Sequence, residues 1–148
     1  MCRFHVVETE PKIVKTYIET GKVKLIYRHL LQLGEGSVRT AEASECAADQ
    51  GTFWPMHDTL YARQDAVYAT ADLDATLTGF AKDLGMDTSA FADCMDSHKQ
   101  LAAVQADYEA AQRAGVRFRP SFDIDGQRLT GALPFSLFQQ RIDAALAR

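Results

Sequence analysis

The period of the hydrophobic pattern changes twice along the chain, and this limits the folds available to it. Between residues 37 and 115 apolar side chains recur at helical spacing, whereas Val23–His29 and the segments beside Asp125-Gly126 alternate as strands do. A helical stretch of this length exceeds a simple crossover between two strands. We therefore expect a small sheet that carries a large helical insertion at about residues 37–115.

The N-terminal part is expected to form one helix followed by one strand. Phe4–Thr20 has the helical pattern, and Gly21 stands where a helix commonly ends. Pro11 within this pattern predicts a kink. The β-branched and aromatic run Val23–His29 predicts a strand. The apolar stripe of the helix is expected to contain Phe4, Val7, Pro11, Val14 and Ile18.

The remaining elements are predicted from local signals. Asp125-Gly126 between two alternating segments predicts a hairpin, and Pro134 opens a last helix that runs to Ala147. Aspartates before apolar runs predict helix caps. In the middle we expect helices over Ser37–Gln50 and Phe53–Val67, one capped by Asp72 or Asp74, one capped by Asp87 or Thr88, and one from Ser97 to Gly115.

Length and charge exclude several classes of function. The chain has 148 residues and a formal net charge of −4, which suits a single domain and gives no reason to expect nucleic acid or an anionic membrane as a partner. No apolar run approaches the roughly 20 residues of a membrane span, and no signal peptide is visible. No Cys/His spacing typical of metal sites occurs, so we expect neither a metal nor a cofactor.

Cys2 is the residue that most suggests chemistry. It stands where the first helix begins, and the free N–H groups and dipole of a helix N-terminus favour a thiolate. Cysteine is present three times, which permits one internal disulfide and one free thiol.

Three separated segments together resemble the DsbA-like thiol-disulfide oxidoreductases. Taken in order, they cover essentially the whole chain. The resemblance implies an α/β class and a thioredoxin-like fold with an inserted helical subdomain, in a single domain of residues 1–148 whose first β-strand is missing from this chain. The matching segments are Cys2–Phe4 with Glu8–Pro11, Ala43–Trp54 with Met56–Asp58, and Gly115–Phe122 with Asp125-Gly126.

The resemblance assigns Cys2 to the second, resolving cysteine of the family's Cys-x-x-Cys motif. The first cysteine, which attacks the substrate in that family, has no counterpart here. We expect either a truncated version of a longer protein or a naturally shortened, redox-altered relative. In both cases the chain lacks a complete dithiol and is expected to be inactive or impaired as an oxidase.

The resemblance also implies roles for residues beside Cys2. Pro120 is expected to be cis and to lie beside the redox cysteine, with an ordinary trans turn as the alternative. Arg119 and Phe118 precede it as expected substrate contacts, and a cation at Arg119 would favour a neighbouring thiolate. His5 is a further candidate for binding near Cys2, and the alternative is an exposed helix histidine.

Cys46 and Cys94 lie on different predicted helices of the insertion. The resemblance implies a structural disulfide between them, and the alternative is two buried cysteines that act as small apolar residues. Closing a loop of about 50 residues would contribute roughly 4 kcal/mol in the chain-entropy account. Cys2 would then be the free thiol.

The predicted function is thiol-disulfide exchange with protein or peptide substrates. A redox-inactive module that grips extended peptides is the first alternative, and a glutathione-using DsbA-like isomerase is the second. The resemblance further implies an extracytoplasmic location. If the first strand is absent, the open sheet edge is expected to allow a homodimer.

Overall fold

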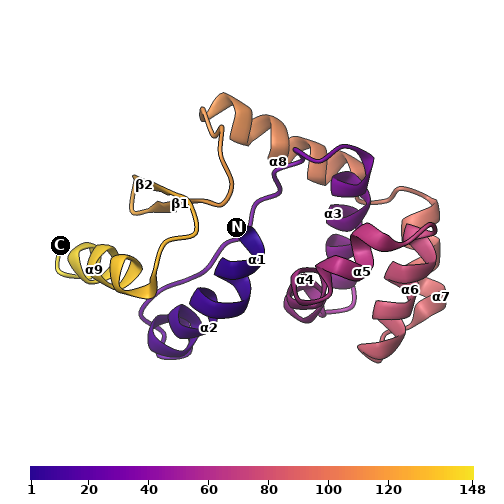
Figure 1. The fold of residues 1–148 in the computed structure, drawn as a ribbon, viewed down its shortest axis with the longest axis horizontal. Coiled ribbons are helices and arrows are strands. Elements are labelled where there is room, and N and C mark those ends of the chain that lie inside the picture. Colours follow the sequence, from indigo (N-terminus) through magenta and orange to yellow (C-terminus); the bar gives the residue numbers. More distant parts are fainter. The chain divides into compact units, whose positions relative to one another are not determined.

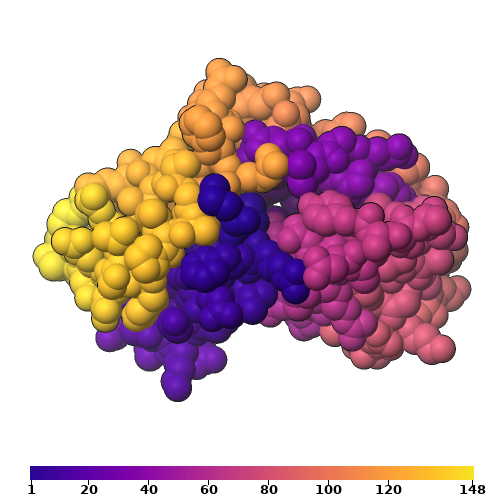
Figure 2. Space-filling model, viewed as in Figure 1, coloured from indigo at the N-terminus to yellow at the C-terminus, as the bar shows by residue number.

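The computed structural model describes residues 1–148 and divides into two compact units (Figure 1). The first unit combines both ends of the chain, Met1–Tyr27 and Val116–Arg148, and the second contains Arg28–Gly115. Figure 2 shows the indigo N-terminal residues lying against the yellow C-terminal residues of the first unit. None of the helices combines the length and the apolar character needed to span a membrane.

The first helix runs from Cys2 to Ile18 and is partly π-helical. Two α-helical pieces, α1 (Cys2–Phe4) and α2 (Glu10–Ile13), alternate with the π-helical turns η1 (His5–Thr9) and η2 (Val14–Ile18). Pro11 lies in the first turn of α2, directly after η1. Because proline has no N–H to donate, the wider π turn before it accommodates the residue that the sequence analysis expected to kink the helix.

The predicted apolar stripe of this helix was wrong. Phe4 and Val7 are exposed, and the buried side chains are His5, Thr9, Ile13 and Tyr17. These four recur at every fourth residue. On an ordinary α-helix, with roughly 3.6 residues per turn, side chains at this spacing would move gradually from one face to another. Five-residue hydrogen bonds, such as Glu10 N–H to the His5 carbonyl, widen the turn and keep the four side chains on one face.

The predicted strand Val23–His29 is not part of a sheet. The sheet has only β1 (Ser121–Ile124) and β2 (Gln127–Thr130). Side chains in the segment nevertheless alternate between more and less buried, with Val23, Leu25 and Tyr27 on the inner side. The alternation was predicted correctly. A β-strand also requires backbone hydrogen bonds to a neighbouring strand, and the sheet contains only β1 and β2.

The C-terminal hairpin and helix complete the first unit. β1 and β2 pair antiparallel through the two-residue loop Asp125-Gly126, and both loop residues have positive φ, at 49° and 79°, as a type I′ turn requires. The hairpin prediction is thus confirmed. Helix α9 (Phe135–Leu146) contacts α2 and β1. The core is formed by Ile13, Tyr17, Phe138 and Ile142, with Val23, Phe122, Ile124, Leu129, Leu133 and Phe135 packed around them.

The second unit is entirely helical. The side chain of Asp72 accepts a hydrogen bond from the Ala75 amide, and that of Asp87 accepts from Ser89 and Ala90, which confirms both as helix caps. The predicted helix Phe53–Val67 is broken at Arg63, and the helix predicted from Ser97 begins at Leu101. The helices are α3 (Glu35–Ala48), α4 (Phe53–Ala62), α5 (Gln64–Ala69), α6 (Leu73–Asp83), α7 (Thr88–Asp96) and α8 (Leu101–Arg113).

The core of this unit lies among α3, α4, α6 and α7. The buried residues include Met56, Leu77 and Phe91, none of which retains exposed surface. Cys46 and Cys94 lie in the same cluster. Helix α3 is rich in alanine, which allows α4 and α7 to pack closely against it.

Candidate functional site

The candidate site lies in the first unit and is built around Cys2. This residue is half-buried at the first turn of the N-terminal helix and is the free cysteine of the chain. Burial raises the pKa of the Cys2 thiol above its ordinary value, while the α-amino group of Met1 and the guanidinium of Arg119 act in the opposite direction. The expectation that the helix end would favour the thiolate is therefore corrected, because desolvation outweighs the nearby positive charges.

The loop before β1 supplies the other candidate residues. The Arg119–Pro120 peptide bond is cis, as the resemblance implied. The loop is tied to the hairpin at two points: the Ser121 hydroxyl donates to the Phe118 carbonyl at 2.6 Å, and the Gly131 amide donates to the Pro120 carbonyl at 2.8 Å. Phe118 is 69% exposed, so this anchored loop presents a large apolar side chain to solvent.

Arg119 influences the Cys2 thiol electrostatically although the two residues are far apart in sequence. The charge of Arg119 lowers the cost of ionising the thiol, and its own side chain is exposed. A half-buried thiol whose ionisation is favoured by a cation on an exposed loop has the parts needed for exchange with a disulfide, because the thiolate is the attacking species.

His5 is not an exposed helix residue, so that alternative was wrong. It is 4% exposed, and its ring packs against Phe122 at a centroid distance of 4.4 Å and against Phe138 at 5.2 Å. A side chain so enclosed offers little surface to a substrate. Its Nε2 atom lies 3.6 Å from the Glu10 carboxylate.

Glu10 is a residue that the sequence analysis did not single out at this site. It stands five positions after His5, a spacing that places two side chains together on a π turn but not on an α-helix. The only indication of this π turn in the sequence is Pro11 within a helical pattern. A proline predicts a disturbed turn but not the direction of the side chains around it.

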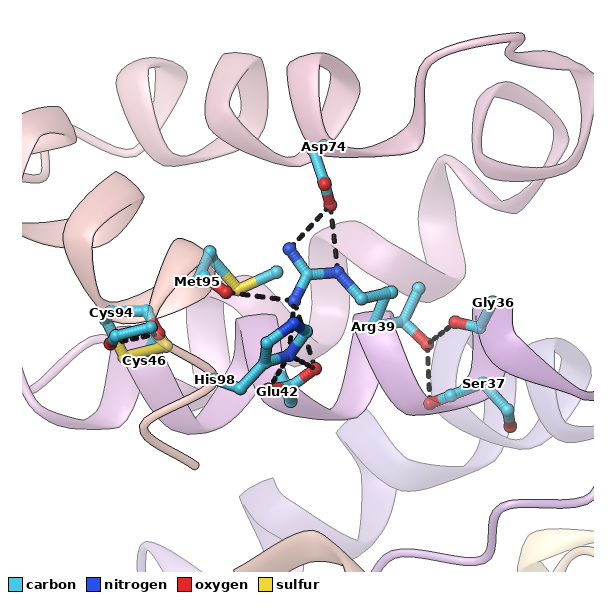
Figure 3. A network of polar contacts seen from close by, with 11 residues as sticks. Gly36, Ser37, Arg39, Glu42, Cys46, Asp74, Cys94, Met95 and His98 are labelled. Carbon is cyan, nitrogen blue, oxygen red and sulfur yellow. Dashed lines mark hydrogen bonds and ion pairs between the residues drawn. A yellow bond between two sulfur atoms is a disulfide. The ribbon is translucent and has the colours of Figure 1, made fainter. Parts of the chain in front are cut away.

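Cys46 and Cys94 are joined by a disulfide between α3 and α7 in the second unit (Figure 3). The two residues are 1% and 8% exposed, so the sulfur atoms are shielded from solvent. The Asp49 carboxylate lies 3.9 Å from the Cys94 sulfur and accepts hydrogen bonds from Lys99 and Gln100. This burial suits a structural bond rather than one that exchanges with substrates.

Figure 3 also shows a buried polar network that the sequence analysis missed. Arg39 on α3 donates to Asp74 at 2.8 Å, to Glu42 at 3.1 Å and to the Met95 carbonyl at 3.0 Å. Glu42 is fully buried, and its second contact is the His98 Nδ1 atom at 3.1 Å. The network ties α3 to α6 and to the end of α7, so its role is structural.

Comparison with known proteins agrees with the fold. The family described as Thioredoxin matches residues 1–144. Two solved structures cover 99% of the chain: BdbD from Bacillus subtilis in its oxidised form, with a TM-score of 0.86 and 19% identity over 81% of that chain, and alpha-DsbA1 from Wolbachia pipientis, with a TM-score of 0.85 and 22% identity over 79% of that chain.

The chain spans only part of the length of the curated relatives that it matches. A Na⁺/H⁺ antiporter NhaA from Herminiimonas arsenicoxydans is 34% identical over 74% of this chain, which spans 17% of the antiporter. A probable disulfide bond formation protein D from Bacillus anthracis is 27% identical over 84% of this chain, which spans 59% of that protein.

The thioredoxin-like fold with a helical subdomain is thereby confirmed. The chain belongs to the thioredoxin family and has the fold of its DsbA-like members.

Proposed function

We propose that Cys2 carries out thiol-disulfide exchange with protein or peptide substrates beside the loop Phe118–Pro120. The single observation that supports this most is the placement of a half-buried free thiol within the electrostatic reach of Arg119, at the anchored loop before β1. In the exchange, the Cys2 thiolate attacks one sulfur of a disulfide. A new sulfur–sulfur bond forms to that atom, and the other sulfur leaves as a thiolate.

The chain by itself is proposed to stop at a mixed disulfide. Cys46 and Cys94 are already bonded to each other, so Cys2 has no free thiol in this chain with which to form an internal disulfide. In the family register Cys2 is the resolving cysteine, and its partner would stand three positions before it. Little dithiol oxidase activity is therefore expected of residues 1–148 alone.

Mass spectrometry after incubation with oxidised glutathione tests the exchange. We expect one glutathione per chain, attached at Cys2, and none on Cys2→Ser. An N-terminal extension that places a cysteine three positions before Cys2 should convert the trapped mixed disulfide into turnover with a reduced peptide. A wild-type chain that stays unmodified while it binds extended peptides would instead support the redox-inactive peptide-binding module.

The substrate surface is proposed to include Phe118 and Arg119. Phe118 presents an exposed ring for apolar peptide side chains, and Arg119 places a charge near the reacting sulfur. His5 is too deeply buried to belong to this surface. Replacing Phe118 with Ser should slow exchange with a disulfide-linked peptide severalfold and leave exchange with glutathione nearly unchanged. Equal slowing of both reactions would argue against a peptide contact.

The location and the assembly of the protein are proposed on separate grounds. The buried Cys46–Cys94 disulfide favours an oxidising, extracytoplasmic compartment. The sheet has only the strands β1 and β2, and its open edges favour pairing with a second copy. Labelling of intact cells with a membrane-impermeant thiol reagent tests the location, and labelling that occurs only after lysis would contradict it.

Light scattering tests the assembly. A monomer at all concentrations would contradict the proposed pairing.

A second candidate function is redox control of a membrane ion transporter. The observation that favours it is the 34% identity with part of an antiporter, above the 27% found with the disulfide bond formation protein. Na⁺/H⁺ exchange would be measured in vesicles that contain such an antiporter together with this chain. The rate should depend on the redox state of Cys2 and lose that dependence with Cys2→Ser. A rate that is unaffected by the wild-type chain would exclude this function.

A further inference from the structure

The Cys46–Cys94 disulfide (Figure 3) is shielded unequally at its two sulfur atoms. Cys46 is 1% exposed and lies in the apolar cluster of the second unit, whereas Cys94 is 8% exposed. A dissolved thiol therefore reaches the Cys94 sulfur first. Attack there forms a bond from the thiol sulfur to Cys94 and releases Cys46 as a thiolate. Apolar surroundings disfavour that thiolate, so burial already slows this route.

Asp49 places a negative charge at the more accessible sulfur. It stands at the C-terminal end of α3, three positions after Cys46, and its Oδ2 atom lies 3.9 Å from the Cys94 sulfur. A disulfide sulfur carries no hydrogen, so the contact is not a hydrogen bond in the oxidised protein. The Asp49 side chain is 38% exposed, so the carboxylate borders both the sulfur and the solvent.

Lys99 and Gln100 hold this carboxylate in place. Both donate to the same Oδ2 atom of Asp49, Lys99 Nζ at 2.7 Å and Gln100 Nε2 at 2.9 Å. The hydrogen bond from Lys99 lowers the pKa of Asp49 below its ordinary value, so the group is ionised at neutral pH. The positive charge of Lys99 offsets part of the negative charge that acts on the sulfur.

The end of α7 explains why Lys99 faces Asp49. The Lys99 amide donates to the Cys94 carbonyl at 3.2 Å, and the His98 amide donates to the Met95 carbonyl at 3.3 Å. With His98 at a φ of 51°, these two bonds form a Schellman motif. The chain reverses its direction there, so the ion pair is positioned by backbone geometry directly beside the disulfide.

We propose that Asp49 protects the Cys46–Cys94 disulfide from reduction by anionic thiolates. A thiolate that attacks Cys94 must bring its negative charge beside the Asp49 carboxylate, and attack on Cys46 would release Cys94 as a thiolate next to the same group. The carboxylate thus opposes both routes. Complete reduction joins two reductant thiols in one disulfide and leaves Cys46 and Cys94 as thiols. The inference does not depend on the proposed exchange at Cys2.

The rate of reduction by small thiols of different charge tests the proposal on the full chain. The chain is incubated with mercaptoethanol, mercaptopropionate or cysteamine and quenched with iodoacetamide. Mass spectrometry then follows the rise from one label, at Cys2, to three. Rates are compared at equal thiolate concentration, because the three reagents differ in pKa.

Asp49→Asn should be reduced by mercaptoethanol about fivefold faster than the wild type, the factor that corresponds to two unit charges about 4 Å apart in water. The acceleration should be larger with mercaptopropionate, whose carboxylate adds a second negative charge. It should be smaller with cysteamine, whose ammonium group offsets the thiolate. Added salt should diminish all three differences.

Two further variants separate the effect of charge from a loosening of the fold. Lys99→Met removes the cation and leaves the carboxylate, so it should slow reduction by mercaptoethanol about twofold, whereas a loosened structure would react faster. Asp83→Asn removes a carboxylate from a comparable ion pair, with Arg63 at 2.7 Å, and should leave the rate unchanged.

Three results would overturn the protective role of Asp49. They are an unchanged rate for Asp49→Asn, an acceleration that is equal for all three thiols, and faster reduction of Lys99→Met. Each would leave exchange at Cys2 standing, because the mixed disulfide with glutathione is measured independently.

Discussion

Tyr17 illustrates how one buried side chain joins the two ends of the first unit. It is 2% exposed, and its hydroxyl donates to the Asp143 carboxylate at 2.6 Å, linking the N-terminal helix to α9. Burial, together with this carboxylate, raises the pKa of Tyr17 to about 12. The hydroxyl is held in its neutral, donating form by a negative neighbour.

Replacing Tyr17 with Phe should lower the free energy of unfolding by about 1 kcal/mol at neutral pH, since Asp143 loses its donor while the ring packing stays. An unfolded tyrosine loses its proton near pH 10. The wild type should therefore lose stability between about pH 10 and about pH 12, as the unfolded chain releases a proton that the folded chain retains. Tyrosinate absorbance should show one late-ionising tyrosine that is absent from Tyr17→Phe. A single transition near pH 10 in both proteins would contradict this.

Arg39 and Glu42 form a buried charge pair, and its contribution to stability cannot be measured by replacing only one of the two residues. Replacing Arg39 with Met leaves the fully buried Glu42 without its strongest partner, and we expect a cost of about 3–5 kcal/mol. The double variant Arg39→Met, Glu42→Met removes both charges and should recover much of that loss. Urea unfolding of the single and double variants measures the difference. Equal destabilisation of both would show that the pair is not coupled.

At the residue scale, the sequence singled out the free thiol and the cis-proline loop, but not the burial that raises the pKa of the thiol. Cys2, Arg119 and Pro120 were singled out through the family resemblance, because the matching segments fixed their order. The pKa direction of Cys2 was wrong, since burial depends on residues distant in the sequence. The exposed alternative for His5 was wrong for the same reason: Phe122 and Phe138, which bury it, lie more than a hundred positions away.

At the scale of elements, features set by neighbouring residues were predicted and those set by distant ones were not. The Asp125-Gly126 turn and the caps Asp72 and Asp87 depend on local backbone geometry, and all three are present. The segment Val23–His29 was assigned as a strand from its alternation, but pairing decides a strand. The buried face of the first helix was misassigned because π turns change its period.

The π turns lead to a prediction about which face of the first helix stabilises the unit. Ile13 is 7% exposed within the core, whereas Val7, on the face predicted from the α-helical period, is 45% exposed. Ile13→Ala should cost about 2–4 kcal/mol, and Val7→Ala no more than about 0.5 kcal/mol. Thermal unfolding of both variants gives the comparison. A larger loss for Val7→Ala would restore the α-helical assignment.

At the scale of the whole molecule, the two units are stabilised by different kinds of interaction. The first unit relies on a core built from both chain ends. The second has a larger helical core, a buried ion network and the disulfide. The family resemblance predicted the fold as a whole, while length and charge alone had indicated only a single domain.

The disulfide is expected to stabilise the second unit substantially. It joins residues separated by 48 positions, and a loop of this length contributes about 2–4 kcal/mol, chiefly by restricting the unfolded chain. The double variant Cys46→Ala, Cys94→Ala should show a correspondingly lower midpoint in guanidinium, and reduction of the wild type should have a similar effect. An unchanged midpoint in both cases would mean that the bond contributes nothing.

The central claim is that Cys2 is the exchanging thiol of a thioredoxin-family site, and mixed-disulfide formation tests it most directly. Wild type, Cys2→Ser and the Cys46→Ala, Cys94→Ala variant would each be incubated with oxidised glutathione and analysed by mass spectrometry of the intact chain. The claim predicts one glutathione on the wild type and on the double variant, and none on Cys2→Ser. Glutathione retained on Cys2→Ser, or absent from the wild type, would contradict it.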